Sequence, residues 1–309
     1  MIGINVLKNI CLKNIFTLIE SKSIMNDVQT FTAVVGSMAC NANCKFCVSK
    51  MTPDFHHDKT FNVAKFQKAA KYAHSCGANT FLITGKGEPL LSIDEIKSMI
   101  ILTRDLFPII ELQTNGILLT KEILDDFRNL GLTTVSLSCV GRNLVLNKKI
   151  ISDKFVDLKT NVELIHDSNL IVRLSTIMIK DGLDSLSKII DYIEYCNHIG
   201  IDQIKLFPVS RPKISRNAEI TEWVDDNSVS LTILNQLKNF LNKKATKLMN
   251  LAHGDTIYSY QNDKMRTDQN VSFGSCLTES GDDTVIRQVI YCSDNKVRYS
   301  WQFNGAILF

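Results

Sequence analysis

The stretch MACNANCKFC, residues 38–47, decides how the chain is to be understood, because its three cysteines follow a C-x3-C-x2-C spacing. It comes directly after the apolar run Phe31–Val35, which predicts a buried strand. Cys40, Cys44 and Cys47 can converge on one metal centre if the loop wraps around it. Cysteine thiolates are the usual ligands of iron–sulfur clusters, which normally take four. A cubane held by three leaves one iron open to an external molecule.

A second motif, TGKGEPL at residues 84–90, follows another apolar run. The cysteine spacing and this turn together resemble the signature of the radical S-adenosylmethionine (radical SAM) enzymes, whose "GGEP" element follows the second strand. Lys86 stands among the glycines of that element. The resemblance covers about residues 30–210. It implies a 4Fe–4S cluster on the three cysteines, with SAM chelating the open iron. Reductive cleavage of SAM would then yield methionine and a 5′-deoxyadenosyl radical that abstracts a hydrogen atom from the substrate.

The resemblance also implies which residues contact SAM. Gly85, Gly87 and Glu88 would form the backbone edge that receives the methionine amino group, since glycine lets a backbone approach a ligand closely. Asn115 would lie at the end of the third strand. No "GxIxGxxE" pattern is found on the fifth strand, where IMI occupies residues 177–179, so the adenine contacts are left unassigned.

Two further strands carry polar residues on one face. Ser136 and Ser138 alternate on the fourth strand and therefore point to the same side. The resemblance implies that a serine near Ser138 could bind the ribose or carboxylate of SAM. Arg173 interrupts the apolar fifth strand, and a buried arginine needs an acceptor. The acceptor is either a carboxylate of SAM or substrate, or Glu111 in a structural ion pair. Lys205 and Arg211, near the sixth strand, could meet the substrate.

Other kinds of metal site fit part of the pattern. Structural zinc prefers a closed set of four ligands, and His56 or His57 could complete it. The chain could then be a non-catalytic iron–sulfur or zinc protein. The glycine-rich turn argues against both, because a module without SAM has no use for it. Cys276 and Cys292 could belong to an auxiliary cluster, with ordinary buried thiols as the default.

Strand and helix patterns alternate six times between residues 30 and 210, which is the rhythm of βαβ units on a parallel sheet. Together with the resemblance, this predicts an α/β fold: a partial (β/α)6 TIM-like barrel with its chemistry at the carboxyl ends of the strands. Residues 211–309 are expected to form an α+β C-terminal extension. Its expected elements are a polar loop at Ser215–Asp226, a helix at Leu231–Leu251, and a hairpin of Thr284–Cys292 with Lys296–Phe303. The hairpin or the tail Gly305–Phe309 could close over the substrate as a lid.

Composition limits the remaining possibilities. The chain has 309 residues, a net charge of +3 and nine cysteines, which suggests a reducing compartment, by default the cytoplasm, rather than a disulfide framework. Residues 1–29 are expected to form an amphipathic helix that packs on the barrel, or alternatively lies on a membrane surface. The expected partners are an external one-electron donor of the flavodoxin or ferredoxin type and a small-molecule or nucleotide-like substrate. Peptide and RNA substrates stay open.

Overall fold

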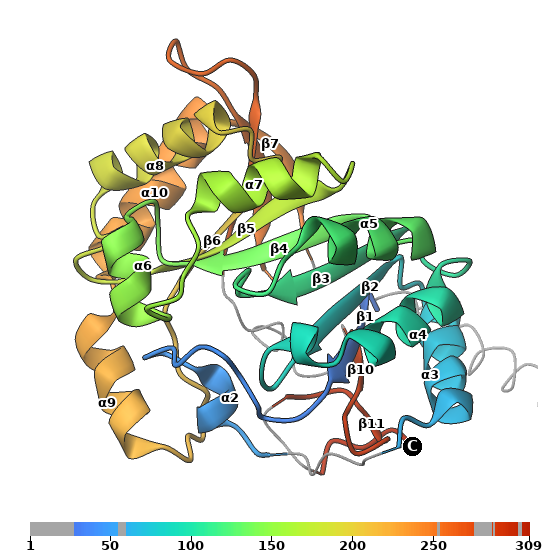
Figure 1. The fold of residues 1–309 in the computed structure, drawn as a ribbon. Coiled ribbons are helices and arrows are strands. Elements are labelled where there is room, and N and C mark those ends of the chain that lie inside the picture. The colour runs from blue at the N-terminus through green and yellow to red at the C-terminus, as the bar shows by residue number, and fades with distance from the viewer. Residues whose placement is uncertain (1–27, 55–59, 252–253, 275–285, 287, 302–304) are drawn as a thin grey trace, which may run out of the picture.

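The computed structural model describes residues 28–54, 60–251, 254–274, 286, 288–301 and 305–309. A parallel sheet forms its centre, with helices packed along one face (Figure 1). Six strands pair side by side in chain order. They are β1 (Thr30–Val35), β2 (Thr80–Gly85), β3 (Ile109–Thr114), β4 (Thr134–Cys139), β5 (Ile171–Met178) and β6 (Gln203–Pro208).

The connections between these strands are helical. They contain α2 (Val48–Met51), α3 (Val63–Ser75), the 3-10 turn η1 (Pro89–Leu91), α4 (Ile93–Thr103), α5 (Lys121–Leu130), α6 (Leu144–Ile150), α7 (Leu158–His166) and α8 (Leu186–His198). The predicted α/β architecture is confirmed, with six strands in the predicted order.

The C-terminal part of the chain extends the same sheet at both edges. It contains α9 (Ala218–Asn227), α10 (Leu231–Lys244), β7 (Thr246–Asn250), β8 (Thr256–Tyr260), β9 (Gln269–Phe273), β10 (Gln288–Tyr291) and β11 (Val297–Arg298). β10 pairs parallel with β1, and β9 pairs parallel with β6. The sheet order is β11-β10-β1-β2-β3-β4-β5-β6-β9-β8-β7, so the described strands form an open sheet rather than a closed barrel.

Local sequence explains where several helices begin. The side chains of Asn62, Thr120 and Ser185 each accept a hydrogen bond from the backbone N–H three residues later, which satisfies a donor that the first helical turn leaves open. Ser92 precedes α4 but makes no such bond. Gly131 follows α5 with φ of 128°, a conformation that suits glycine.

Side chains of one face of the strands pack against the helices. In β1 and β2, Phe31 and Phe81 stack with ring centroids 5.2 Å apart, and Phe66 of α3 packs on both rings. All three are fully buried. Side chains alternate along a strand. The neighbouring residues of β1 and β2, such as Thr32, Val34 and Thr84, therefore face the opposite, inner side of the sheet.

Several element predictions were wrong. Residues 215–226 are not a loop, since α9 begins in this stretch with Asn217 as its cap. The helix predicted for Leu231–Leu251 ends at Lys244, and β7 follows it. Strands β8 and β9 were not predicted at all.

The hairpin prediction is confirmed where it can be assessed, because β10 and β11 pair antiparallel. The tail continues this edge of the sheet. Leu308 N donates to Val297 O at 2.7 Å, and the ring of Phe309 packs against Tyr72 of α3 with centroids 5.8 Å apart.

The predicted N-terminal helix lies outside the described residues except for its last two positions, Val28 and Gln29. None of the helices in the described part of the chain combines the length and the apolar character needed to cross a bilayer.

Candidate functional site

The cysteine loop lies at the carboxyl end of β1 and is held from outside by the end of α6. Asn43 N donates to Ile151 O at 2.9 Å, and Lys45 N donates to Ile150 O at 3.0 Å. Cys40 is exposed, whereas Cys44 and Cys47 are half-buried. Cys47 also stands immediately before α2. The loop is therefore fixed at its middle and its end.

The chemistry of this donor set fits a cluster. Burial, together with the neighbouring Cys47 and Cys40, raises the pKa of the Cys44 thiol to about 12. Three neighbouring thiolates need a cationic group to compensate their charge, and the iron of a cluster would supply it. No group of three His, Cys, Asp or Glu side chains among the described residues could hold a single metal ion. In a cubane, by contrast, each thiolate binds a different iron. His56 and His57 lie outside the described residues.

The glycine-rich turn packs directly on the cysteine loop. Glu88 N donates to Ala39 O at 2.9 Å. A Cβ atom at Gly87 would lie 1.9 Å from Ala39 O, and one at Gly85 would lie 2.9 Å from Gly87 O. Such distances exclude a side chain at Gly87 unless the backbone moves. The two motifs found in the sequence therefore form one continuous surface.

Glu88 joins this turn to the end of β3. Its carboxylate accepts hydrogen bonds from Leu90 N at 3.2 Å, Thr114 Oγ1 at 2.6 Å and Asn115 N at 3.0 Å. Burial raises the pKa of Glu88, while these hydrogen bonds lower it. Since the carboxylate is occupied within the protein, a contact between Glu88 and SAM would have to come from the backbone of Glu88.

Asn115 connects the third strand to the cysteine loop. Its Nδ2 donates to Asn41 Oδ1 at 2.7 Å and lies 4.0 Å from Cys40 Sγ. Gly85, Gly87, Glu88 and Asn115, all predicted as SAM contacts, therefore lie together beside the predicted cluster ligands. Asn41 belongs to the same network and was not singled out from the sequence.

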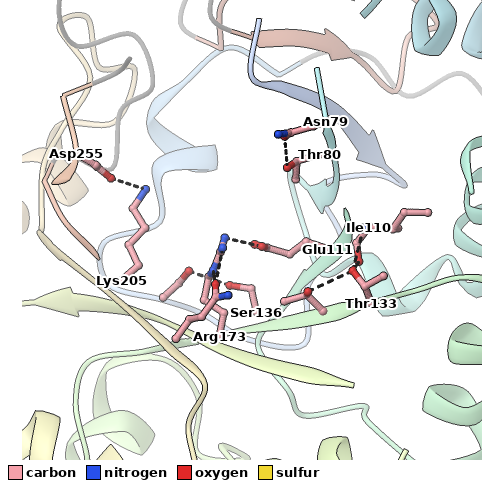
Figure 2. Close-up of polar contacts among 12 residues, drawn as sticks. Asn79, Thr80, Ile110, Glu111, Thr133, Ser136, Arg173, Lys205 and Asp255 are labelled. Carbon is pink, nitrogen blue, oxygen red and sulfur yellow. Dashed lines mark hydrogen bonds and ion pairs between the residues drawn. The ribbon is translucent and has the colours of Figure 1, made fainter. Parts of the chain in front are cut away.

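Ser136, Ser138 and Arg173 lie on the inner face of β4 and β5. Ser136 Oγ is 2.9 Å from Ser175 Oγ. Arg173 Nη1 forms an ion pair with Glu111 Oε2 at 2.5 Å (Figure 2). Its Nε and Nη2 donate to Gln203 Oε1 at 2.9 and 2.7 Å. The structure thus supports the ion pair with Glu111 among the two alternatives for this arginine.

Lys205 and Arg211 occupy different environments. Lys205 projects from the inner face of β6 and pairs with Asp255 at 3.2 Å (Figure 2). Arg211 lies at the surface and pairs with Asp225 of α9 at 2.8 Å. Asp255 carries no sequence signal, because it is a lone acid in a polar segment whose strands were not predicted.

The side chain of Lys86, which lies between Gly85 and Gly87 in the sequence, points toward the interior at the carboxyl end of the sheet. Its Nζ donates to Thr52 Oγ1 at 2.6 Å and lies 5.6 Å from the centre of the Trp301 ring. Burial lowers the pKa of Lys86 to about 8. Trp301 in turn packs on an apolar cluster of Val34, Ile290 and Cys292. A lysine within the turn is thus used as an inward-facing group, which the sequence did not indicate.

Cys292 is buried in that cluster, and burial raises the pKa of its thiol to about 11. Cys276, the other cysteine of the predicted auxiliary cluster, lies outside the described residues. The seven described cysteines, including Cys292, are all free thiols.

A hollow of about 430 Å³ opens next to Cys40 on the solvent side of the cysteine loop. It is lined by the loop, by the last turn of α6 and by the residues that follow it; the charged residues of the lining are Lys45, Lys148, Lys149 and Asp153. Three lysines and one aspartate give this opening a positive character.

Comparisons with known proteins agree with this geometry. Among solved structures, the SuiB protein of Streptococcus suis bound to S-adenosylmethionine is similar over 95% of this chain and 66% of its own, with a TM-score of 0.60 and 15% identity. A structure of anSMEcpe with bound AdoMet is similar over 70% of this chain and 58% of its own, with a TM-score of 0.51 and 15% identity. At these identities the likeness concerns the fold.

The curated protein MJ0804 of Methanocaldococcus jannaschii, described as uncharacterized, is 34% identical over 99 residues, which is 32% of this chain and 30% of that protein. This chain thus matches less than a third of that relative's length. The sequence profile of the Radical SAM superfamily matches residues 34–207, which is more than half of the chain and spans β1 to β6. The chain therefore belongs to the radical SAM superfamily of enzymes.

Proposed function

We propose that this enzyme holds a 4Fe–4S cluster on Cys40, Cys44 and Cys47, and that SAM binds beside Gly85, Gly87 and Asn115. The observation that carries the proposal is the junction of three segments: the cysteine loop, the glycine-rich turn and the end of β3. Glu88 and Asn115 hold them together. When bound, the cluster and SAM supply a 5′-deoxyadenosyl radical that takes a hydrogen atom from the substrate.

The protein's own residues supply position and shielding. The backbone of the glycine-rich turn lies against Ala39. This contact fixes the distance between the turn, where SAM would bind, and the cysteine loop. Phe46 packs near Trp223 of α9, so that two aromatic rings cover one side of the loop. Exclusion of water and stray donors is what a radical site requires of its protein.

Electrons would come from an external one-electron carrier of the flavodoxin or ferredoxin type. The hollow beside Cys40 supports an approach from that side, because its lining lysines favour an acidic partner. The nine cysteines support a reducing compartment such as the cytoplasm.

We propose a small, polar or nucleotide-like substrate. Support comes from the inner face of β3 to β6, where Glu111, Ser136, Arg173, Gln203 and Lys205 are all polar. A second candidate is a peptide, since SuiB, which is similar over nearly the whole of this chain, has been solved with its precursor peptide SuiA. An RNA substrate is not favoured by any observation on the described surface.

Anaerobic reconstitution with iron and sulfide, reduction with dithionite and assay for 5′-deoxyadenosine test the proposal. We expect about four iron atoms per chain and SAM-dependent 5′-deoxyadenosine. Cys44→Ala should lose both the visible absorption and the activity, whereas Cys76→Ala, which removes a cysteine outside the loop, should keep both. A colourless zinc protein, or a brown protein that never cleaves SAM, would refute the proposal. About eight irons would indicate an auxiliary cluster.

A further inference from the structure

The inner face of the sheet is polar and reached by solvent. On β3 to β6 the outward residues Leu112, Leu137, Leu174 and Leu206 are at most 1% exposed. Their inward neighbours, which include Gln113, Ser138, Ser175 and Lys205, remain partly exposed. Barrels of parallel strands usually fill their interior with layers of branched apolar side chains. Here the polar lining indicates a space that water, or a polar ligand, occupies.

Two cations from neighbouring strands project into this space. Arg173 on β5 and Lys205 on β6 rise from the same side of the sheet (Figure 2). Their side chains are 35% and 23% exposed, whereas those of their partners Glu111 and Asp255 are 2% and 0% exposed. Each carboxylate is therefore buried behind its cation, and the cations are the groups that a ligand would meet.

Donors on both cations remain available to a ligand. Lys205 has three N–H donors, and in the described part of the chain Asp255 is its ion-pair partner. Arg173 uses Nη1 for Glu111 and its Nε and Nη2 for Gln203, which leaves two of its five N–H donors. Ser175 lies directly beside Lys205 in the strand register and adds a hydroxyl.

The position of Asp255 is fixed by backbone. A Cβ atom at Gly274, just after β9, would lie 1.9 Å from Asp255 Oδ1, so a glycine is needed for the carboxylate to reach Lys205. Leu251 N donates to Asp255 O at 2.8 Å. A buried ion pair is weak evidence for a purely stabilising role, because its desolvation cost offsets its attraction. Holding a lysine in place for a ligand is a use that this arrangement fits.

We infer that Arg173 and Lys205 form an anion-binding subsite in the interior of the sheet, which takes a carboxylate or phosphate group of the substrate. The reading of the bound anion as part of a substrate rests on the proposed function. Planar Arg and compact Lys groups bind both kinds of oxyanion. The opposite inner wall, with Val34, Ile290 and Trp301, is apolar. The substrate then carries its acidic group toward β5 and β6 and a less polar part toward β1.

Ligand-observed NMR with inorganic phosphate and with acetate, at low ionic strength, tests the subsite directly. Wild-type protein should bind at least one of them saturably. Lys205→Met should weaken binding about tenfold or more, while Lys205→Arg should keep it within about threefold. Asp255→Asn keeps the shape beside Gly274 and removes the competing charge, so it should bind the anion more tightly than wild type. Lys238→Met, at an exposed lysine of α10, is the matched control and should match wild type.

A preference for phosphate would identify a phosphorylated substrate, and a preference for acetate would identify a carboxylic acid; either supports the subsite. Absence of saturable binding in both wild type and Asp255→Asn would overturn it, as would binding that is unchanged in Lys205→Met. If Lys205→Met does not fold, Asp255→Asn decides alone. Formation of 5′-deoxyadenosine without substrate is measured on the same proteins. If wild-type protein forms no 5′-deoxyadenosine, the proposed function is refuted, whereas the result on anion binding is unaffected.

Discussion

Gly87 carries the tightest steric constraint in the candidate site, because any Cβ there would lie 1.9 Å from Ala39 O. The sequence motif predicted that this glycine matters, and the structure supplies the reason: two loops separated by more than forty residues touch through their backbones. The position of Asn115 beside the cysteine loop was likewise predictable from motif and strand order. The pairing of Asp255 with Lys205 and the inward direction of the Lys86 side chain were not predictable, because no sequence pattern shows what a single charged residue faces.

Replacing Gly87 by alanine should displace the cysteine loop. We expect the iron content after reconstitution to fall well below that of wild type, and the free energy of unfolding to fall by about 1–3 kcal/mol, as for other overpacked sites. Iron analysis and urea unfolding measure the two effects. Gly305→Ala is the control, since a Cβ there meets nothing within 4 Å. Full iron occupancy in Gly87→Ala would contradict the close approach.

The burial of Lys86 predicts a pH dependence of stability. Its pKa is about 8 in the folded protein and about 10.4 in an unfolded chain. Between these values the folded state has released a proton that the unfolded state still binds, so folding becomes more favourable as the pH rises. Below about pH 8 the lysine is charged in both states and the cost of its burial is constant.

Lys86→Met should remove this dependence. Between pH 8 and 10 we expect wild type to gain up to about 1.4 kcal/mol per pH unit relative to the variant, measured by urea unfolding of cluster-free protein under reductant. Lys148→Met controls for the loss of a lysine at the surface. A difference between wild type and Lys86→Met that stays constant with pH would show that the Lys86 ammonium is not buried in solution.

At the scale of elements, prediction succeeded where periodicity and caps agreed and failed where burial is one-sided. Thr120 caps α5 and Gly131 follows it, so both ends of this helix are marked by its sequence. The helix α9 was missed because Val224 is its single buried residue, so its apolar stripe is faint. All five residues of β7 are exposed, and an edge strand without a buried face has no alternation to detect.

The ion pair of Arg173 joins three elements, since Glu111 lies on β3, Arg173 on β5 and Gln203 on β6. Arg173→Met should lower the free energy of unfolding by about 3–5 kcal/mol, because it leaves the buried Glu111 carboxylate without its cation. Glu111→Gln should cost less, since Arg173 keeps Gln203 and solvent. The double variant Arg173→Met with Glu111→Leu should regain much of the loss in urea unfolding. A double variant as unstable as Arg173→Met would disprove this account.

At the scale of the molecule, the sequence could not predict that β9 and β10 join the sheet in parallel beside β6 and β1. Pairing between such distant segments is decided by tertiary packing, and no local pattern records it. The resemblance covered residues 30–210 and therefore described the centre of the sheet but not its two edges. The predicted extension is thus built onto both sides of the centre.

Deleting Gly305–Phe309 tests the tail as a lid. The deletion removes the backbone hydrogen bonds between the tail and Val297 and should lower the free energy of unfolding by about 1–3 kcal/mol. The iron content should stay at the wild-type value, because the tail packs on β11 and α3. A several-fold loss of 5′-deoxyadenosine formation is expected if the tail shields the radical. Unchanged turnover would refute the lid.

The described strands run from β11 to β7 without a ladder between these two ends. In a closed barrel the hydrogen bonds between strands fix the circumference. An open sheet can widen without breaking any of these bonds. The width of the space inside this sheet is therefore determined by the side chains and helices at its two edges, β11 and β7. A protein of this fold can therefore accept substrates of different width through changes at the two edges of the sheet, with no change in the residues around the cysteines.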